Sequence, residues 1–326
     1  ALDRLDLSQV QIDLLRRLYQ QFFDAETRKA LGEFYTNEEI VNEILDGVGY
    51  HGEYILDKRL LDMSCGSGTF LIVAIRRFIE AGKQKGLSNT EILEHLQTGI
   101  LGIDIHPFAV AMARVNYLLA ISELIDATVR RVLGKFIIPI YWTDSLAGFR
   151  KRPEPTGIPI IEVDVSPLGT FNLPDHSELD WDYLIDITKK AVTENWEENR
   201  YLQEFSEDVV LKYKDTLLSF LRKFKKRASE GRDSRWLSTL RNVIIVDKLM
   251  GQCDFVVGNP PWVRIHNVDE QLRKRIAEKY AFYGKKAGWN PRLKKTRIPF
   301  REQVDYSIAF VEAALRYLKE DGFFGF

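Results

Sequence analysis

The residues best suited to chemistry follow an apolar run, residues 255–257, that is typical of a buried strand. After Gly258 come Asn259, Pro260, Pro261 and Trp262. Two prolines cannot continue a central strand and they fix the backbone, so they predict a stiff loop. That loop presents amide and carbonyl acceptors beside a flat indole, which suits a planar group with an exocyclic amine. Taken alone, the same residues also fit a strand that ends in a proline-rich turn.

A glycine turn earlier in the chain has the composition of a ligand-binding loop. Asp62 ends a short apolar run, and Cys65, Gly66 and Gly68 follow before a predicted helix. Small turn residues let a ligand approach the backbone, and open α/β sheets bind ligands at the carboxyl ends of their strands. The turn is no P-loop, because no Lys-Ser or Lys-Thr follows, and it lacks the third glycine of the dinucleotide fingerprint.

Two further apolar runs also end in acidic residues. Residues 99–105 include Asp104 near their end, and an acid after a second strand can accept from both hydroxyls of a ribose. Residues 138–146 form a third run, which ends near Asp144. Each acid alone is more often a cap or a turn residue. Three such strands in series indicate a ligand site on an α/β sheet.

A polar segment before these strands predicts the start of a helix. Thr36 and Glu39 have the spacing of a capping box, and apolar residues at helical spacing follow them. The free N–H groups of such a start can bind a carboxylate or a phosphate, although an ordinary cap is an equal interpretation. Residues 9–30, which precede it, predict an amphipathic packing helix.

Residues 151–246 interrupt the alternation of strands and helices. Their first part is rich in proline, residues 175–208 hold eleven acidic and three basic side chains, and residues 212–241 hold ten basic and three acidic ones. Apolar residues at helical spacing predict a basic amphipathic helix that ends near Gly231. We interpret this region as a largely helical insertion, and a solvated helical excursion is the alternative.

The region after Trp262 is basic and aromatic. Residues 272–301 contain eleven Lys and Arg and a single acidic residue, Glu278. Lysine and arginine neutralise phosphates, and aromatic side chains, here including Tyr280, can stack on bases. The composition therefore favours contact with nucleic acid.

The overall composition restricts the class of protein. The 326 residues carry a formal net charge of −1 and two cysteines, which predicts no disulfide framework and fits a reducing, cytoplasmic compartment. No apolar run approaches membrane-spanning length and no signal peptide is visible, so no membrane partner is expected. The chain stops within an apolar run, residues 322–326, and we expect a C-terminally truncated fragment of a longer protein.

Together and in this order, the motifs resemble the S-adenosylmethionine-dependent adenine-N6 DNA methyltransferases. The match is narrower to the gamma class, which includes the methyltransferase parts of type I and type IIG restriction–modification enzymes. In that class a Tyr-Thr segment precedes the glycine-rich motif and an Asn-Pro-Pro-aromatic motif follows it. The resemblance covers residues 31–150 and 250–326. Met63-Ser64 and His106 depart from the usual residues of the family without removing a needed group.

The resemblance implies a role for each motif residue and a Rossmann-like, doubly wound α/β sheet. Residues that would bind S-adenosylmethionine are Tyr35, Thr36, Asp62, Cys65, Gly66, Gly68, Asp104, Ile105, Asp144 and Leu146. Catalytic residues that would hold the target base are Asn259, Pro260, Pro261 and Trp262. Candidate nucleic-acid contacts are Arg264, Lys285, Lys286, Arg292, Lys294 and Lys295. Thr36 would lie at the methionine end of the cofactor, Asp104 at the ribose and Asp144 at the adenine amine.

The implied chemistry is methyl transfer to an aromatic amine. Such an amine is a poor nucleophile because its lone pair is delocalised into the ring. Acceptance of both N–H hydrogens, by Asn259 and by the carbonyl of Pro260, favours a pyramidal nitrogen that can attack a sulfonium methyl in line. The base must flip out of the duplex and stack on Trp262. No metal is required.

Other substrates and other roles stay open. Protein glutamine N5-methyltransferases also use an Asn-Pro-Pro-aromatic motif, and RNA bases are a further alternative. The Tyr-Thr segment, the insertion and the basic region argue against the glutamine methyltransferase, and the RNA-base alternative stays open. A different class is a cofactor-binding fragment that is inactive without its target-recognition domain.

The predicted organisation has four segments. Residues 1–53 form an N-terminal helical segment, residues 54–150 the cofactor-binding half of the sheet, residues 151–246 the insertion, and residues 247–326 the catalytic half. The expected partners are double-stranded DNA, a target-recognition domain outside this chain, and restriction or phage-defence subunits.

Overall fold

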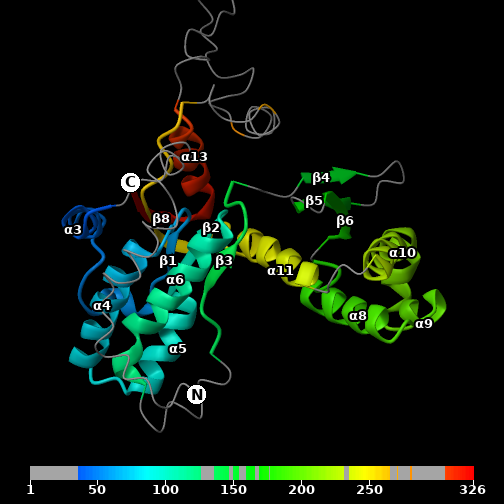
Figure 1. Ribbon diagram of the computed structural model, residues 1–326, viewed down its shortest axis with the longest axis horizontal. Coiled ribbons are helices and arrows are strands. Elements are labelled where there is room, and N and C mark those ends of the chain that lie inside the picture. The colour runs from blue at the N-terminus through cyan, green and yellow to red at the C-terminus, as the bar shows by residue number, and fades with distance from the viewer. Residues whose placement is uncertain are drawn as a thin grey trace, which may run out of the picture. The chain divides into compact units, whose positions relative to one another are not determined.

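The computed structural model divides the chain into two compact units. One consists of Ala1–Leu146 and Leu249–Phe326, and the other of Ala147–Lys248 (Figure 1). The structure describes residues 36–125, 136–146, 150–153, 159–165, 169–175, 177–230, 235–264, 270, 280 and 305–326. The helix expected at residues 9–30 lies outside these ranges. Each unit is described by itself.

The first unit contains a five-stranded parallel sheet. Its strands are β1 (Leu60–Asp62), β2 (Ile100–Asp104), β3 (Ile140–Trp142), β7 (Cys253–Val257) and β8 (Leu318–Gly325), in the order β3-β2-β1-β7-β8. Asp62 lies opposite Gly102 of β2 and Val257 of β7. Strand order therefore reverses between β1 and β7, which is the point where open α/β sheets bind their ligands. This doubly wound α/β sheet confirms the predicted fold class.

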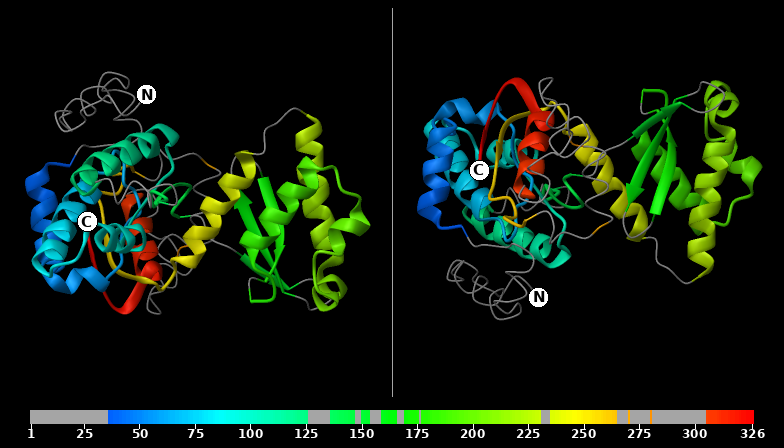
Figure 2. Two further views of the ribbon diagram at one scale, coloured as in Figure 1. Left: turned by 90° about the horizontal axis from the view of Figure 1, so that it is seen from below. Right: turned by 90° about the horizontal axis from the view of Figure 1, so that it is seen from above.

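Helices surround this sheet in both views of Figure 2. They are α3 (Glu38–Gly47), α4 (Thr69–Gln84), α5 (Asn89–Gly99), α6 (Pro107–Ala120) and α13 (Ser307–Tyr317), with short 3-10 turns η3 (Glu53–Asp57) and η4 (Ser122–Leu124). Ser88 and Glu91 form a capping box at the start of α5, and Pro107 occupies the first turn of α6. Phe78, Ile100 and Phe255 are among the side chains buried between helices and sheet.

Strand β8 runs from Leu318 to Gly325 and includes Asp321-Gly322, two residues that are typical of turns. Its pairing with β7 is irregular, because Cys253 faces Leu318 whereas Phe255 faces Phe323. Between these pairs β8 has four residues and β7 has one, so the register shifts there and β8 continues past the turn residues.

The second unit combines a small sheet with helices. Strands β4 (Arg150–Pro153), β5 (Pro159–Val165) and β6 (Gly169–Pro174) pair antiparallel in that order. The helices are α8 (Trp181–Thr193), α9 (Glu198–Leu202), α10 (Glu207–Ser229) and α11 (Arg235–Lys248). The amphipathic helix predicted before Gly231 is α10, but the sheet was not foreseen. Prolines hid it because they stand at strand ends, where they interrupt no interior ladder.

This unit has its own hydrophobic core. Phe171 of β6 stacks on Phe224 of α10, with ring centroids 5.4 Å apart, and Phe205, Trp196 and Leu217 lie in the same buried cluster. A solvated helical excursion would bury no such cluster. The insertion is a folded unit and not an extended loop.

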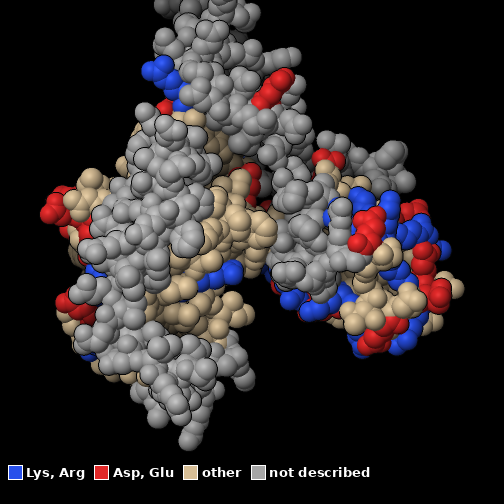
Figure 3. Space-filling view, viewed as in Figure 1, with Lys and Arg blue, Asp and Glu red and all other residues tan. Residues whose placement is uncertain are grey.

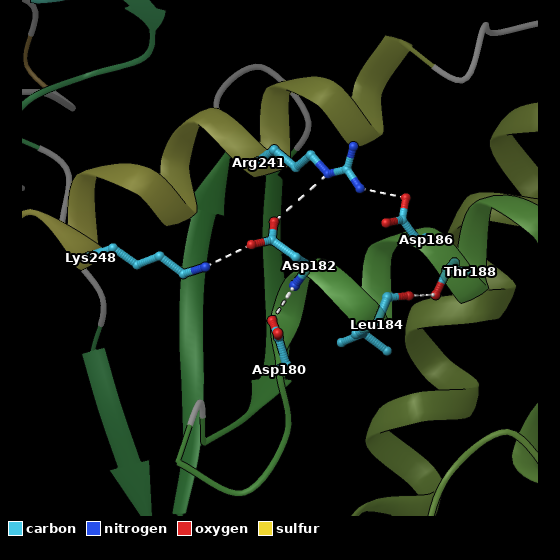
Figure 4. A network of polar contacts seen from close by, with 7 residues as sticks. All are labelled: Asp180, Asp182, Leu184, Asp186, Thr188, Arg241 and Lys248. Atoms are coloured by element: carbon cyan, nitrogen blue, oxygen red, sulfur yellow. Dashed lines mark hydrogen bonds and ion pairs between the residues drawn. The ribbon is translucent and has the colours of Figure 1, made fainter. Parts of the chain in front are cut away.

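The opposite charges of the two adjacent stretches pair inside this unit. Lys248 donates to Asp182 at 2.7 Å, and Arg241 of the same helix contacts Asp182 at 3.8 Å and also bonds Asp186, which ties α11 to α8 (Figure 4). Arg222 of α10 donates to Glu198 of α9 in the same way. Basic and acidic side chains consequently alternate over the surface of this unit in Figure 3. Lys212, Arg222 and Arg241 of residues 212–241 thus pair with acidic side chains of their own unit.

Within the described ranges, no helix combines the length and the apolar composition that a membrane span requires.

A matched pair of leucines on α10 tests the core of the second unit. Leu217 is fully buried, whereas Leu211 of the same helix is 85% exposed. Leu217→Ala should lower the free energy of unfolding by about 2–5 kcal/mol, because it removes buried methyl groups and leaves a cavity. Leu211→Ala should change it by less than about 0.5 kcal/mol. Urea denaturation followed by circular dichroism measures both, and equal effects would contradict the core described here.

Candidate functional site

The predicted motifs meet at the carboxyl ends of β1, β2 and β7. Asp62 ends β1, Asp104 ends β2, and Gly258 follows β7 directly. Because β1 pairs with both neighbours in parallel, the loops after all three strands emerge at one edge of the sheet. The topology therefore brings together residues that are nearly 200 positions apart in sequence.

The glycine turn is an open loop that leads into α4. Gly66 and Gly68 have φ values of +52° and +92°, in the left-handed region that favours glycine. Gly68 is the N-cap of α4 and supplies no side chain, so the first N–H groups of the helix have no side-chain cap. A Cβ atom added at Gly66 would meet nothing within 4 Å. The backbone of the loop is therefore accessible to a ligand, with the N-terminus of a 16-residue helix beside it.

Asp104 fixes this loop to the end of β2. Its Oδ2 accepts from the Gly66 N–H at 2.8 Å and its Oδ1 accepts from the His106 N–H at 2.8 Å. The Cys65 N–H adds a bond to the Ile103 carbonyl at 2.9 Å. Each carboxylate oxygen has a second lone pair, so Asp104 can hold the loop and still accept from a hydroxyl of a ligand.

An exposed apolar side chain lies next to Asp104. Ile105 is 62% exposed, and its carbonyl accepts from the indole N–H of Trp142 at 2.9 Å. Leu146 is buried, and its N–H donates to the Asp144 carboxylate at 2.9 Å while its carbonyl accepts from the Tyr280 hydroxyl at 2.9 Å. Tyr280 is thus buried in the first unit, which corrects the expectation that its ring could stack on a base.

Asp62 is a buried acid whose protonation state is shifted. Burial raises its pKa to about 8, the Ser64 N–H that donates to it at 3.1 Å lowers it, and nearby Asp104 raises it. Its carboxyl group is therefore largely neutral at pH 7 in the ligand-free protein. Gly258 packs directly against it: at φ +153°, a Cβ there would come within 2.7 Å of the Asp62 Oδ1.

In the loop after β7, the side chains of Asn259 and Trp262 are hydrogen-bonded to each other. Asn259 Nδ2 donates to the Thr36 Oγ1 at 3.1 Å, and Trp262 Nε1 donates to the Asn259 Oδ1 at 2.7 Å. Trp262 is 52% exposed and Pro260 is buried. The Ser64 hydroxyl, at 3.5 Å from the Asn259 carbonyl, connects this loop to the glycine turn.

Thr36 has a different role from the one its spacing suggested. The N-cap of α3 is Asn37, whose side chain accepts from the Glu39 N–H at 3.2 Å, and the helix begins at Glu38. Thr36 and Glu39 therefore form no capping box. The shift by one residue leaves the Thr36 hydroxyl free of the helix end and in contact with Asn259.

Two residues of the candidate site were not expected from their sequence context. Trp142 binds the carbonyl of Ile105, and Ser64 contacts both Asp62 and Asn259. Position offered the only signal: Trp142 ends a strand beside Asp144, and Ser64 lies inside the glycine turn.

Several predicted residues lie outside the described ranges. These are Tyr35, Lys285, Lys286, Arg292, Lys294 and Lys295. Arg264 is described: it is exposed, and its backbone bridges to Asp305 ahead of α13. The described part of the site thus contains Thr36, the glycine turn, the strand-end acids and the loop after β7.

Comparisons with known proteins place these motifs in a family. The sequence model described as Eco57I restriction-modification methylase matches residues 98–326, and the model described as N-6 DNA Methylase matches residues 10–132. The type II methyltransferase M.BstVI of Geobacillus stearothermophilus is 37% identical over 75 residues, which are 23% of this chain and 13% of that protein. The adenine-specific methyltransferase PglX of Streptomyces coelicolor is 33% identical over 113 residues, which are 32% of this chain and 9% of PglX.

Among solved structures, the type IIL restriction-modification enzyme MmeI in complex with DNA aligns with 96% of this chain and 32% of that chain, at 15% identity and a TM-score of 0.43. The chain spans only a small part of the length of each of these relatives. Because the first family model matches most of the chain, the chain belongs to the Eco57I restriction-modification methylase family.

Proposed function

We propose that this chain carries the cofactor-binding and catalytic residues of a DNA methyltransferase that methylates the N6 amine of adenine. The observation that carries the proposal is the loop after β7, where the amide oxygen of Asn259 lies beside the exposed indole of Trp262 at the switch point of the sheet. The similarity to PglX, an adenine-specific methyltransferase, and the matches to the two methylase family models support the same reaction.

The residues around the glycine turn fit S-adenosylmethionine. The open space beside Gly66 can hold the methionine part, and the acceptor oxygens of Asp104 suit the ribose hydroxyls. Ile105, which is exposed without a ligand, offers an apolar face to an adenine ring, with Asp144 and Leu146 at its edge. Tyr35 and Thr36 would close the methionine end, and Cys65 and Gly68 shape the turn. S-adenosylmethionine supplies an electrophilic methyl group on a sulfonium.

The loop after β7 then positions and activates the acceptor amine. Two acceptors, the side-chain oxygen of Asn259 and the backbone carbonyl of Pro260, can each take one N–H of the amine. That arrangement withdraws the lone pair from the ring and directs it out of the ring plane. Trp262 offers the stacking face for a base that has left the duplex, and Pro261 stiffens the loop.

Double-stranded DNA is the proposed partner. Arg264 and the basic side chains of residues 272–301 would neutralise phosphates next to the site. For the complete protein we further propose a target-recognition region, restriction or defence partners and a cytoplasmic location. Within this chain, residues 54–150 would bind the cofactor, residues 247–326 would hold the base, and residues 1–53 would contribute the Tyr-Thr segment.

Loss of the amide acceptor tests the reaction. Asn259→Ala should reduce methyl transfer to DNA adenine by on the order of 100-fold or more, because it removes a hydrogen bond that strengthens in the transition state. Affinity for S-adenosylhomocysteine, measured by calorimetry, should change little. Asn172→Ala, at an exposed position of β6, is the matched control and should transfer normally.

The same assay decides between acceptors. Radiolabelled transfer is measured in parallel to duplex DNA, to RNA and to a glutamine-containing peptide. Transfer by Asn259→Ala at the wild-type rate would contradict the role of the loop. Transfer to RNA or to peptide in preference to DNA would replace the proposed substrate.

Two buried-acid substitutions test the electrostatics of the site. Because the pKa of Asp62 is about 8 in the folded protein and about 4 in an unfolded chain, the folded state holds a proton that the unfolded state releases between these values. Stability therefore falls as pH rises through that window. Asp62→Asn keeps an oxygen that can accept from the Ser64 N–H, and it removes the cost of ionising a buried carboxyl group at high pH. We expect a higher Tm than wild type at pH 8, an equal Tm near pH 4, and weaker cofactor binding.

Asp254 is the matched control, because its pKa is shifted down where that of Asp62 is shifted up. Burial acts against its charge, but Lys319, the Arg59 N–H and Lys58 together hold the pKa of Asp254 below its usual range. That charge stabilises the fold at neutral pH and loses its effect as pH falls through the lowered pKa. Asp254→Asn should therefore lower the Tm at pH 8. Scanning calorimetry from pH 4 to pH 8 measures both variants, and shifts of the same sign would contradict the assignment.

Charge reversal in the basic stretch tests the DNA contact. Replacing Lys285, Lys286, Lys294 and Lys295 together by Glu should weaken binding to duplex DNA and reduce the slope of log affinity against log salt. Fluorescence anisotropy across salt concentrations measures both quantities. Reversing Lys212, Lys214, Lys225 and Lys226 of α10 is the control, with the same change in net charge. Equal losses from the two sets would show a general charge effect.

A further inference from the structure

We propose that Thr36 is a positioning residue that holds the amide of Asn259 in the orientation set by the indole of Trp262. This inference rests on the proposed transfer to an exocyclic amine, and it goes beyond the contact with the methionine end of the cofactor. The observation behind it is the chain of hydrogen bonds from Trp262 through Asn259 to Thr36.

The indole decides which way the amide faces. An indole N–H can only donate, so the atom of Asn259 that faces Trp262 must be its oxygen. The amide nitrogen then faces the opposite side, where the Thr36 hydroxyl accepts from it at 3.1 Å. The reversed amide would place its two N–H donors against the indole donor and lose that bond. The indole therefore selects the orientation of the amide, and the Thr36 hydroxyl adds a second bond that holds the amide in it.

Thr36 is held in place by an anchored helix start. The next residue, Asn37, caps α3, and its carbonyl accepts from the Val41 N–H at 3.1 Å. Helix α3 is bound in turn to α4, because Arg77 donates to the Asn42 side chain at 2.7 Å and to the Asp46 carboxylate at 2.6 Å. The Thr36 hydroxyl therefore lies next to the anchored start of α3. From there it can restrain the side chain of Asn259, which is 223 positions away in sequence.

This orientation is the one that the reaction requires. The amine of a target base brings donors, and only the amide oxygen can accept from them. Without the Thr36 hydroxyl, the Nδ2 of the half-buried Asn259 loses a hydrogen-bond partner, and one restraint on rotation of the amide is gone. The hydroxyl keeps its own proton while it accepts from Asn259, so contact with the cofactor and orientation of Asn259 do not exclude each other.

The structural test uses fluorine NMR of the complete, cofactor-free protein labelled with 5-fluorotryptophan. Loss of one resonance in Trp262→Phe assigns the Trp262 signal. Thr36→Val, which keeps the shape and removes the hydroxyl, should shift that signal because the amide that it bonds is released. Thr36→Ser should leave it near the wild-type position. Thr193→Val, the same change at an exposed position of α8, should have no effect.

The kinetic test uses single-turnover methylation at saturating S-adenosylmethionine. Thr36→Val should slow transfer about tenfold, as expected for loss of one positioning hydrogen bond, and Thr36→Ser should restore it. An unchanged Trp262 resonance in Thr36→Val would overturn the proposal, and slower transfer with an unchanged resonance would leave Thr36 as a cofactor contact alone.

The two hypotheses fail in distinguishable ways. A wild-type protein that methylates no adenine in DNA refutes the proposed function. The resonance of Trp262 still decides whether Thr36 orients Asn259, because that measurement needs neither cofactor nor substrate.

Discussion

Parallel pairing of β1 with β7 is the constraint on which the site depends. The register sets Asp62 opposite Val257, so that the glycine turn and the loop after β7 leave the sheet side by side. Gly258 makes the approach possible, because any Cβ at this position would run into the Asp62 carboxyl. Ser64 completes the connection through the Asn259 carbonyl. A slip of the register by one residue would turn the side chains of β7 to opposite faces and separate the two loops.

The second unit shows why this pairing survives a large interruption of the chain. Residues 147–248 form a unit with its own core and its own balance of charge, so their folding does not depend on the site. Closing a longer loop costs little additional entropy, because the entropic cost grows only with the logarithm of the loop length. The strands β3 and β7 can therefore belong to one sheet although a folded unit separates them in sequence. The pairing of Arg222 with Glu198 and of Lys248 with Asp182 uses the charges within that unit.

Sequence alone predicted the elements whose signals are local. Apolar runs that end in Asp62 and Asp104 predicted β1 and β2, and apolar residues at helical spacing predicted α10. The strands β5 and β6 were not predicted, because prolines at strand ends resemble loop residues when the strand pairing is unknown. Thr36 was misjudged for a related reason. Two adjacent polar residues can each cap a helix, and sequence alone does not show that Asn37 is the cap while Thr36 contacts the distant Asn259.

The residue at position 262 illustrates how one side chain can meet two requirements. Phenylalanine would offer a stacking face without a donor, and the Asn259 amide could then turn either way. Tyrosine carries a hydroxyl that both donates and accepts, so it would tolerate either orientation of the amide as well. The indole of Trp262 combines a large flat face with a group that only donates. Its bond to the Asn259 oxygen therefore sets the polarity of the acceptor, while its ring stays exposed for stacking.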